Sequence, residues 1–236
     1  MATLSGKTAI VTGGSRGIGL AIARALITSD VNVMITGTKE KPLLDALRQL
    51  GAMGMAQTAN VRNYADVERA FEAAAAHFGG IDILVNNAGV GVFAPVATMS
   101  TEQWHDVIDT NVTGVFHCCR AVLPHLRRRG GGWIISISSL SGTNPFANGG
   151  AYCASKAALN AFSESLMQEV RHDGIRVATV APGSVGTSFG GHETSGADWK
   201  LSPNDVAEVV VDLLAHPARS LPSRVEIRPA KPPKKG

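Results

Sequence analysis

Short apolar runs alternate with longer amphipathic stretches along most of the chain. The runs that we predict as strands cover residues 7–11, 32–36, 53–61, 81–86, 133–138, 176–180 and 225–227. The stretches that we predict as helices cover residues 18–29, 42–50, 64–78, 101–109, 111–129 and 152–171, and one more begins after Ser202. Strands that are apolar throughout predict a parallel sheet that is buried on both faces.

We therefore expect one α/β domain over residues 1–236. Strands that alternate with helices are typical of a doubly wound, Rossmann-like fold, here with a seven-stranded, mostly parallel sheet and helices on both faces. Segment 188–200 has neither pattern and holds several glycines, so we expect a flexible substrate loop there. Residues 229–236 are rich in proline and lysine, which predicts a frayed tail.

Composition and charge narrow the functional classes. Hydrophobic residues make up 44% of the chain and charged residues 17%, as in a globular domain. A net charge of +3 gives no reason to expect binding to nucleic acid or to an anionic membrane. No apolar run approaches membrane-spanning length, and the first strand begins too close to Met1 for a signal peptide. The 3 cysteines form no C-x-x-C pair and the histidines form no H-E-x-x-H motif, so we expect a cytoplasmic enzyme without disulfides or a bound metal.

A glycine-rich turn joins the first predicted strand to the first predicted helix. Its spacing is G-x-x-x-G-x-G, and its predicted phosphate-binding residues are Gly13, Ser15, Arg16, Gly17, Ile18 and Gly19. Glycine permits the unusual φ values of a tight turn and lets a pyrophosphate approach the backbone. The helix N-terminus then presents free N–H groups and a positive dipole end to the phosphates. The turn predicts a bound dinucleotide, although a glycine-rich turn without a ligand has the same pattern.

The end of the second strand bears on the choice of dinucleotide. NAD sites place an acid there to bind the ribose 2′-hydroxyl, but this chain has Thr38 and Lys39 and no acid before Glu40. Arg16, Thr38 and Lys39 suit a 2′-phosphate through charge-assisted hydrogen bonds. We therefore expect NADP(H) rather than NAD(H), unless both cations are ordinary surface charges.

Tyr152 and Lys156 form a Y-x-x-x-K pair on a predicted helix. Residues with this spacing lie on one helical face, so we expect the ammonium to stabilise the phenolate and lower the pKa of Tyr152. Such a tyrosine exchanges a proton with an alcohol or a carbonyl oxygen. Ser139 follows a strand at the sheet edge where ligands bind, and is the candidate that holds the substrate oxygen. Ser138 is the neighbouring candidate, but it points to the opposite face and the spacing to Tyr152 favours Ser139.

Several motifs occur in an order that resembles the short-chain dehydrogenase/reductases. They are Thr12-Gly13-x-x-x-Gly17-Ile18-Gly19, Asn86-Asn87-Ala88-Gly89, Asn111, Ser139, Tyr152-x-x-x-Lys156 and Pro182-Gly183. The resemblance covers about residues 5–215 and is nearest to the 3-oxoacyl-(acyl-carrier-protein) reductase-like subgroup. It implies a homodimer or homotetramer, although the ending Ser223–Pro229 departs from the terminal segment of many tetrameric relatives.

The resemblance also implies a role for each matching residue. Tyr152 would be the general acid/base, Lys156 would bind the nicotinamide ribose, Ser139 would polarise the carbonyl, and Asn111 would support proton relay from Lys156. The other implied cofactor contacts are Asn60, Val61, Asn87, Ala88, Gly89, Pro182, Gly183, Val185 and Thr187. Many relatives have Asp at the position of Asn60. Asn60 still offers a side-chain carbonyl and an amide.

The substrate would be selected by three segments, 91–98, 140–149 and 188–200. Within and beside them, Ser139, Ser141, Phe93, Phe146 and Phe189 are the candidate substrate-binding residues, and the aromatic rings would line an apolar pocket. Rings of this kind are also common as plain packing residues.

Three functions remain in view. The first is an NADP(H)-dependent reductase of a small-molecule carbonyl, including 3-oxoacyl thioesters. The second is an NAD(P)+-dependent dehydrogenase of a secondary alcohol, sugar or steroid. The third is a regulator that senses the dinucleotide without catalysis, which predicts a degraded catalytic set. Because Ser139, Tyr152, Lys156 and Asn111 are all present, the sequence favours an enzyme.

Overall fold

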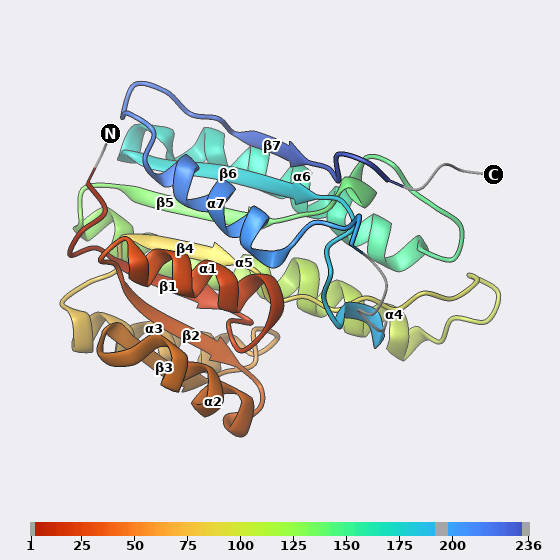
Figure 1. Ribbon diagram of the computed structural model, residues 1–236, viewed down its shortest axis with the longest axis horizontal. Helices are drawn as coiled ribbons and strands as arrows, with labels where there is room; N and C mark the ends of the chain where they lie inside the picture. The colour runs from red at the N-terminus through yellow and green to blue at the C-terminus, as the bar shows by residue number, and fades with distance from the viewer. Residues whose placement is uncertain (1–2, 192–197, 233–236) are drawn as a thin grey trace.

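The computed structural model describes residues 3–191 and 198–232, which build one seven-stranded sheet. The strands are β1 (Thr8–Thr12), β2 (Asn32–Gly37), β3 (Gly54–Thr58), β4 (Ile83–Asn86), β5 (Gly132–Ile137), β6 (Ile175–Pro182) and β7 (Arg224–Ile227). They lie in the order β3-β2-β1-β4-β5-β6-β7, and each neighbouring pair is parallel (Figure 1). The predicted fold class is confirmed.

Helices cover both faces of this sheet. One layer consists of α1 (Gly17–Thr28), α2 (Glu40–Leu50) and α7 (Pro203–Leu214), and the other of α3 (Tyr64–Phe78), α5 (Gly114–Arg128) and α6 (Gly150–Val170). The short helix α4 (Thr101–Ile108) lies beyond the carboxyl ends of the strands, to which the arrowheads in Figure 1 point.

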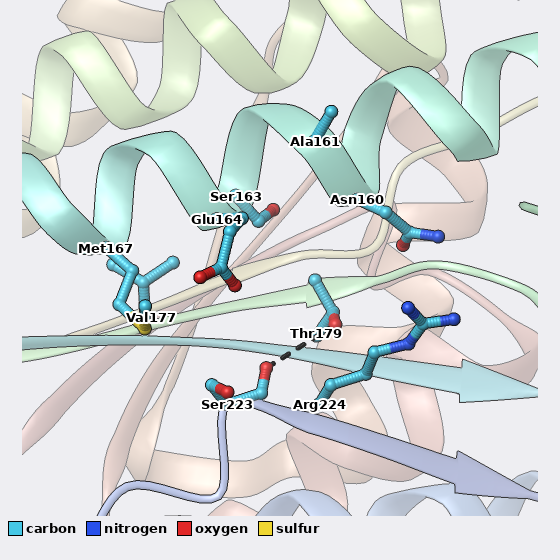
Figure 2. A pocket seen from close by; sticks show the side chains of 9 residues that line it. All are labelled: Asn160, Ala161, Ser163, Glu164, Met167, Val177, Thr179, Ser223 and Arg224. Carbon is cyan, nitrogen blue, oxygen red and sulfur yellow. Dashed lines mark hydrogen bonds between the residues drawn. The ribbon is translucent and has the colours of Figure 1, made fainter.

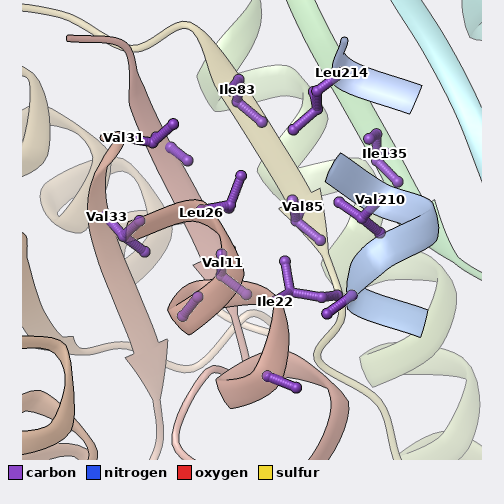
Figure 3. Packing of buried hydrophobic residues seen from close by; sticks show 14 of the residues in the cluster. Val11, Ile22, Leu26, Val31, Val33, Ile83, Val85, Ile135, Val210 and Leu214 are labelled. Atoms are coloured by element: carbon purple, nitrogen blue, oxygen red, sulfur yellow. The ribbon is translucent and has the colours of Figure 1, made fainter. Parts of the chain in front are cut away.

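The sheet separates two hydrophobic cores, and alternate residues of one strand enter different cores. In β1, Val11 packs with α1 and α7, whereas Ile10 packs with α3 and α5, and both are fully buried. Figure 3 shows the first core, in which Val11 and Val85 of the sheet meet Ile22 of α1 and Val210 of α7. Burial on both faces explains why the strand sequences contain so few polar residues.

Local signals set the helix ends. Asn63 begins α3 by accepting a hydrogen bond from the N–H of Asp66, and Gly79 ends it with a left-handed φ of 83°. Ser202 and Asp205 form the reciprocal cap of α7, as their spacing predicts.

The two helices predicted over residues 101–109 and 111–129 are continuous in the structure. A π turn over Asp109–Thr113 joins α4 to α5 (Gly114–Arg128). Such turns widen the helix locally and often occur at functional sites. Here Asn111 is only 1% exposed, and its side chain bonds to the backbone of Val90.

Two predicted segments lie partly outside the described residues. Residues 192–197 of the expected substrate loop and 233–236 of the expected tail are not described, so flexibility there stays a prediction. On either side of the first gap, Val185 forms a parallel bridge with Leu201. Across residues 3–191 and 198–232, no helix combines the length and apolar character that a membrane crossing needs.

Candidate active site

The chain reverses its direction of strand addition between β1 and β4, which are neighbours in the sheet. In open parallel sheets, the crevice at such a reversal, beyond the carboxyl ends of the strands, is where ligands bind. The glycine-rich turn follows β1 here, and the segment that begins with Asn87 follows β4. The predicted cofactor segments therefore converge on one edge.

Glycine is required at two points of the turn. Gly13 and Gly17 have φ values of 65° and 56°, which side chains rarely adopt. A Cβ at Gly13 would also lie 2.9 Å from Cα of Ala88. The N–H of Gly14 donates to the carbonyl of Thr36 at 3.1 Å, so the turn also lies beside the end of β2.

Thr12 fixes this turn to the end of β4, a role that the sequence reasoning missed. Its hydroxyl accepts the N–H groups of Asn87 and Ala88, each at 3.0 Å. The side-chain amide of Asn87 donates to the carbonyls of Thr12 and Gly13 at 2.9 and 3.1 Å. A buried hydroxyl at the last strand residue, directly before the glycines, is the signal that would have found it.

The first turn of α1 is open to an anion. Its N-cap residue, Arg16, makes no capping bond with its side chain, and the turn contains no acid. Ser15, Gly17 and Ile18 are partly exposed around it, whereas Gly19 is buried against Asn87. Arg16 is exposed, as are Thr38 and Lys39 at the end of β2.

The two residues predicted to flank the adenine, Asn60 and Val61, differ in exposure. Asn60 is exposed, but its side-chain oxygen accepts the N–H of Arg62 at 3.1 Å and so serves a local turn. The side chain of Val61 is buried in the core beside Gly114. Val61 therefore offers a ligand its backbone rather than its side chain.

The segment after β6 returns toward the glycine-rich turn. Pro182 is the last residue of β6, and Gly183 continues the pairing by donating to the carbonyl of Ile227 at 2.8 Å. Further along, Thr187 lies opposite Gly17, where a Cβ would come within 3.4 Å of its methyl carbon. Thr187 and Gly17 thus form two sides of the same opening.

The predicted catalytic residues come together from β5 and α6. Tyr152 lies in the first turn of α6, beside Ser139, which is the second residue after the end of β5. Lys156 lies one turn later, 6% exposed, with Nζ 5.8 Å from the centre of the Tyr152 ring. Its ammonium donates to the carbonyl of Ile137 at 2.8 Å.

The pKa of Tyr152 differs from the expectation. Burial raises it above its ordinary value, and the hydrogen bond with Ser139 lowers it only in part. The predicted lowering by Lys156 is wrong for this arrangement, because the ammonium is directed to Ile137 and is itself costly to bury. Burial lowers the pKa of Lys156 from 10.5 to about 8.

Asn111 is connected to the catalytic helix through Ser155, a second residue that the sequence reasoning missed. The amide of Asn111 donates to Oγ of Ser155 at 3.0 Å, and that hydroxyl donates to the carbonyl of Tyr152 at 2.7 Å. Ser155 is fully buried between the two members of the Y-x-x-x-K pair. A small polar residue at that position of a buried helix is a detectable signal.

Ser138, the alternative to Ser139, has a separate partner. Its hydroxyl donates to the side-chain oxygen of Asn160 on α6 at 2.6 Å. Ser139 accepts the N–H of Ser141 at 3.1 Å, which is the contact that the structure gives for Ser141. Both serines therefore contact α6, and the expectation that Ser138 points to the opposite face is wrong, because β5 ends at Ile137 and the alternation of a strand no longer applies to the two residues that follow.

Asn160 also borders a cavity of about 240 Å³ between α6 and the strands β6 and β7 (Figure 2). Its polar lining includes Glu164 from α6 and Arg224 from β7. The lining includes neither Tyr152 nor Lys156, so this cavity is separate from the catalytic residues.

Three phenylalanines lie around Tyr152. The ring centres of Phe93 and Phe189 lie 5.6 and 5.7 Å from that of Tyr152. Phe146 lies 5.9 Å from Phe93. The three phenylalanines are 36, 37 and 48% exposed in the order Phe93, Phe189 and Phe146, so the apolar surface that they form is open to ligands.

Comparison with known proteins agrees with this geometry. The sequence profile described as "short chain dehydrogenase" matches residues 7–197. An uncharacterized oxidoreductase of Staphylococcus epidermidis is 35% identical over 233 residues, 97% of this chain and 100% of the relative. The 3-oxoacyl-[acyl-carrier-protein] reductase of Escherichia coli K12 is 43% identical over 186 residues, 78% of this chain and 75% of the relative.

Solved structures give the same result. A metagenomic short-chain oxidoreductase in complex with NADP superimposes with a TM-score of 0.86 at 34% identity, covering 98% of this chain and 100% of the other. The closed form of a serine dehydrogenase complexed with NADP+ gives 0.88 at 34%, covering 93 and 94%. The chain belongs to the short-chain dehydrogenase/reductase family and is an oxidoreductase, with relatives among the 3-oxoacyl-(acyl-carrier-protein) reductases.

Proposed function

We propose that this protein reduces a carbonyl to a secondary alcohol with NADPH and that Tyr152 is the general acid. The observation that carries the proposal is the meeting of Ser139, Tyr152 and Lys156 at the end of β5, with Nζ of Lys156 5.8 Å from the centre of the Tyr152 ring. The names of the relatives add support, since several are reductases of 3-oxoacyl thioesters.

The residues present fit a nicotinamide dinucleotide. The close approach at Gly13 leaves no room for a side chain, and the first turn of α1 keeps free N–H groups without an acid. The turn residues, together with the backbone after β4 and Thr187, would hold the pyrophosphate and its riboses. When bound, NADPH supplies the hydride that reduces the carbonyl carbon and leaves as NADP+.

We propose that the chain's own residues bind the substrate oxygen and donate a proton to it. Ser139 and Tyr152 offer two preorganised hydroxyl groups to the negative charge that develops on that oxygen. Tyr152 then gives its proton to the oxygen, and a raised pKa keeps the phenol protonated until that moment. Lys156 is buried on the same helical face with its ammonium at the carbonyl of Ile137, and we propose for it the contact with the nicotinamide ribose that the family pattern implies.

Asn111 and Ser155 fix the position of the helical turn that carries Tyr152. They connect the π turn to the backbone of Tyr152 through two hydrogen bonds of 3.0 and 2.7 Å. We infer that Asn111 also supports the return of a proton to Tyr152, as its position in the family pattern implies.

NADP(H) is the proposed cofactor rather than NAD(H). Arg16 and Lys39 are exposed at the ends of β1 and β2, which the Gly14–Thr36 bond holds together. An exposed guanidinium and ammonium there suit a 2′-phosphate. The NADP found in two similar structures supports this choice.

Oxidation of NADPH in the presence of a panel of ketones, including 3-oxoacyl compounds, tests the reaction. We expect turnover with at least one carbonyl compound. Binding of NADPH, followed by its fluorescence, without turnover of any carbonyl or of any alcohol with NADP+ would overturn the proposal in favour of a dinucleotide sensor. Turnover of alcohols alone would instead identify a dehydrogenase of secondary alcohols, sugars or steroids.

We further propose a homo-oligomer. Trp104 on α4 and Phe116 on α5 are 42 and 44% exposed, which supports pairing of subunits through this side of the molecule. Light scattering coupled to gel filtration tests it, and a monomer at micromolar concentration would contradict it.

A further inference from the structure

The entrance to the catalytic tyrosine is built from three segments that carry no ionisable acid or base. Residues 87–101, 138–151 and 177–191 contain no Asp, Glu, Lys, Arg or His. The first two segments are joined directly, because Ala94 donates its N–H to the carbonyl of Asn148 at 2.9 Å. The third brings Phe189 against the first, since a Cβ at Gly91 would lie 2.8 Å from its ring.

Apolar side chains take the place of charges around this entrance. Phe93, Phe146 and Phe189 surround Tyr152 with ring separations of 5.6 to 5.9 Å. Val96 is 82% exposed and lies beside the start of α6, where a Cβ at Gly150 would come within 3.5 Å of its methyl carbon. Large apolar side chains that are exposed together mark a binding surface.

Beyond residue 191, the first charged residues that the structure describes are Asp198 and Lys200. Asp198 is exposed, and Lys200 lies 5.9 Å from the ring centre of Trp199, where a cation–π contact holds it. A substrate arm that carries phosphate groups is bound by Arg or Lys side chains at the mouth of a site. The three uncharged segments offer no such partner.

We infer that the preferred substrate is a neutral ketone with an aryl or other apolar substituent, not a thioester on a phosphate-bearing carrier arm. The inference rests on the proposed carbonyl reduction and narrows its substrate class. The carbonyl would reach Ser139 and Tyr152 while its apolar substituent lies among the phenylalanine rings. Phe146, the most exposed of the three, is then a specificity-determining residue.

A matched pair of substrates tests the inference with the wild-type protein. Ethyl acetoacetate and acetoacetyl-coenzyme A present the same 3-oxoacyl group, but only the second carries phosphates. An aryl ketone such as acetophenone joins the pair as the apolar probe. We expect kcat/KM for the two neutral compounds to exceed that for the thioester by roughly ten-fold or more, since an uncompensated anion is poorly accepted at an apolar entrance.

The dependence on salt sharpens this result. The kcat/KM of the neutral compounds should not change with ionic strength, whereas substrate steering by cations would weaken as salt rises. A thioester that is reduced faster than ethyl acetoacetate, with a rate that falls with salt, would overturn the inference and leave the proposed function standing. Absence of turnover with every carbonyl, while NADPH still binds, would overturn both.

Substitutions at Phe146 provide the residue-level test. Phe146→Ser should lower kcat/KM for acetophenone by roughly ten-fold because it removes apolar contact area, and Phe146→Leu should keep most of it. Phe146→Lys should shift the preference toward acetoacetyl-coenzyme A in a salt-dependent way. Leu44→Ser on α2 is the matched control, because Leu44 is exposed to 44% but lies at the other edge of the sheet. Equal losses in Phe146→Ser and Leu44→Ser would contradict the assignment.

Discussion

The proposed catalytic residues and the proposed substrate entrance are neighbours, but the first are buried polar groups and the second consists of exposed aromatic rings. At the end of β5, Ser139 and Lys156 are 9 and 6% exposed, and each makes a hydrogen bond to the backbone. At the entrance, Phe93 and Phe146 are 36 and 48% exposed and meet through ring contacts. Buried polar groups are costly to displace, whereas exposed apolar rings can be exchanged at small cost.

Because of this difference, we expect one group of residues to determine the rate of the reaction and the other to determine which substrate is preferred. Ser139, Tyr152 and Lys156 are held by the end of β5 and by α6, both of which belong to the packed layers of the fold. The phenylalanines lie largely on segments between these elements. Substitutions in the first group should therefore affect every substrate alike, and those in the second group should change the ranking of substrates.

Tyr152→Phe should give the largest effect. Loss of the phenol proton is expected to lower kcat by about 10³-fold for all carbonyl substrates, while the affinity for NADPH remains within a few-fold of the wild type. Single-turnover rates and fluorescence titration of NADPH measure the two quantities. A variant with normal turnover would remove Tyr152 from the mechanism.

Lys156→Met should stabilise the fold while abolishing efficient turnover. Burial lowers the pKa of Lys156 from 10.5 to about 8, so the unfolded chain binds the proton more tightly than the folded protein. This difference corresponds to about 3 kcal/mol, and loss of the bond to Ile137 offsets about 1 kcal/mol of it. We expect a net gain of about 2 kcal/mol in the free energy of unfolding below pH 8.

The pH dependence gives this prediction its sign. Below pH 8 both states of the wild type are protonated, so the cost of the buried ammonium is constant. Between pH 8 and about 10.5 the folded state loses the proton first, and wild-type stability rises relative to the variant. Urea denaturation across this range measures the difference, and an advantage of Lys156→Met that does not decline with pH would contradict it.

Arg16→Ala tests whether the proposed cofactor site distinguishes NADPH from NADH without affecting the catalytic step. It should weaken NADPH binding by about ten-fold and leave NADH unchanged, because a charge-assisted hydrogen bond to the 2′-phosphate is lost. Lys39→Ala should act in the same direction. Arg24→Ala is the matched control, since Arg24 is an exposed arginine on the same helix. Equal losses for both dinucleotides would rule out 2′-phosphate recognition.

Ser138→Ala should give the smallest effect and tests the rigidity of the catalytic half. The 2.6 Å bond between Ser138 and Asn160 ties β5 to α6, on which Tyr152 lies. We expect a decrease in kcat of about five-fold with an unchanged affinity for NADPH, and recovery in Ser138→Thr. A looser Ser139–Tyr152 bond would also raise the pKa of Tyr152 and move the alkaline limb of the kcat profile upward. A drop in thermal stability alone, without this change in profile, would mean that the bond is only structural.

The sequence predicts the sheet well because its signals are local and repeated. Each apolar run is flanked by glycine or polar residues, and the glycines before α1 identify the first crossover. Spacing along the sequence likewise identifies Tyr152 and Ser139, whereas strand alternation does not separate Ser139 from Ser138, because both follow the end of β5 and both contact α6. The contact between Ser139 and Tyr152 could be expected because, in a parallel sheet, the segments that follow the carboxyl ends of the strands lie at one edge.

Other features depend on contacts between residues that are distant in the sequence, and the sequence did not predict them. The pKa of Tyr152 follows from how deeply the ring is buried and from where the Lys156 ammonium points, and neither is encoded in their spacing. The π turn at Asn111 looks like ordinary helix in the sequence, because one extra residue per turn leaves the apolar pattern almost unchanged. Thr12 acts through backbone N–H groups of a distant segment, and Ser155 through the side-chain amide of the distant Asn111.

The π turn makes the chain unusually sensitive to its length at one place. Removing any one residue from Asp109–Thr113 would restore regular helix and rotate everything on one side by about 100° relative to the other. Asn111 would then face away from Ser155 although no polar group had been substituted. Natural variation should therefore conserve the number of residues in this turn more strictly than their identity, whereas surface loops tolerate changes in length.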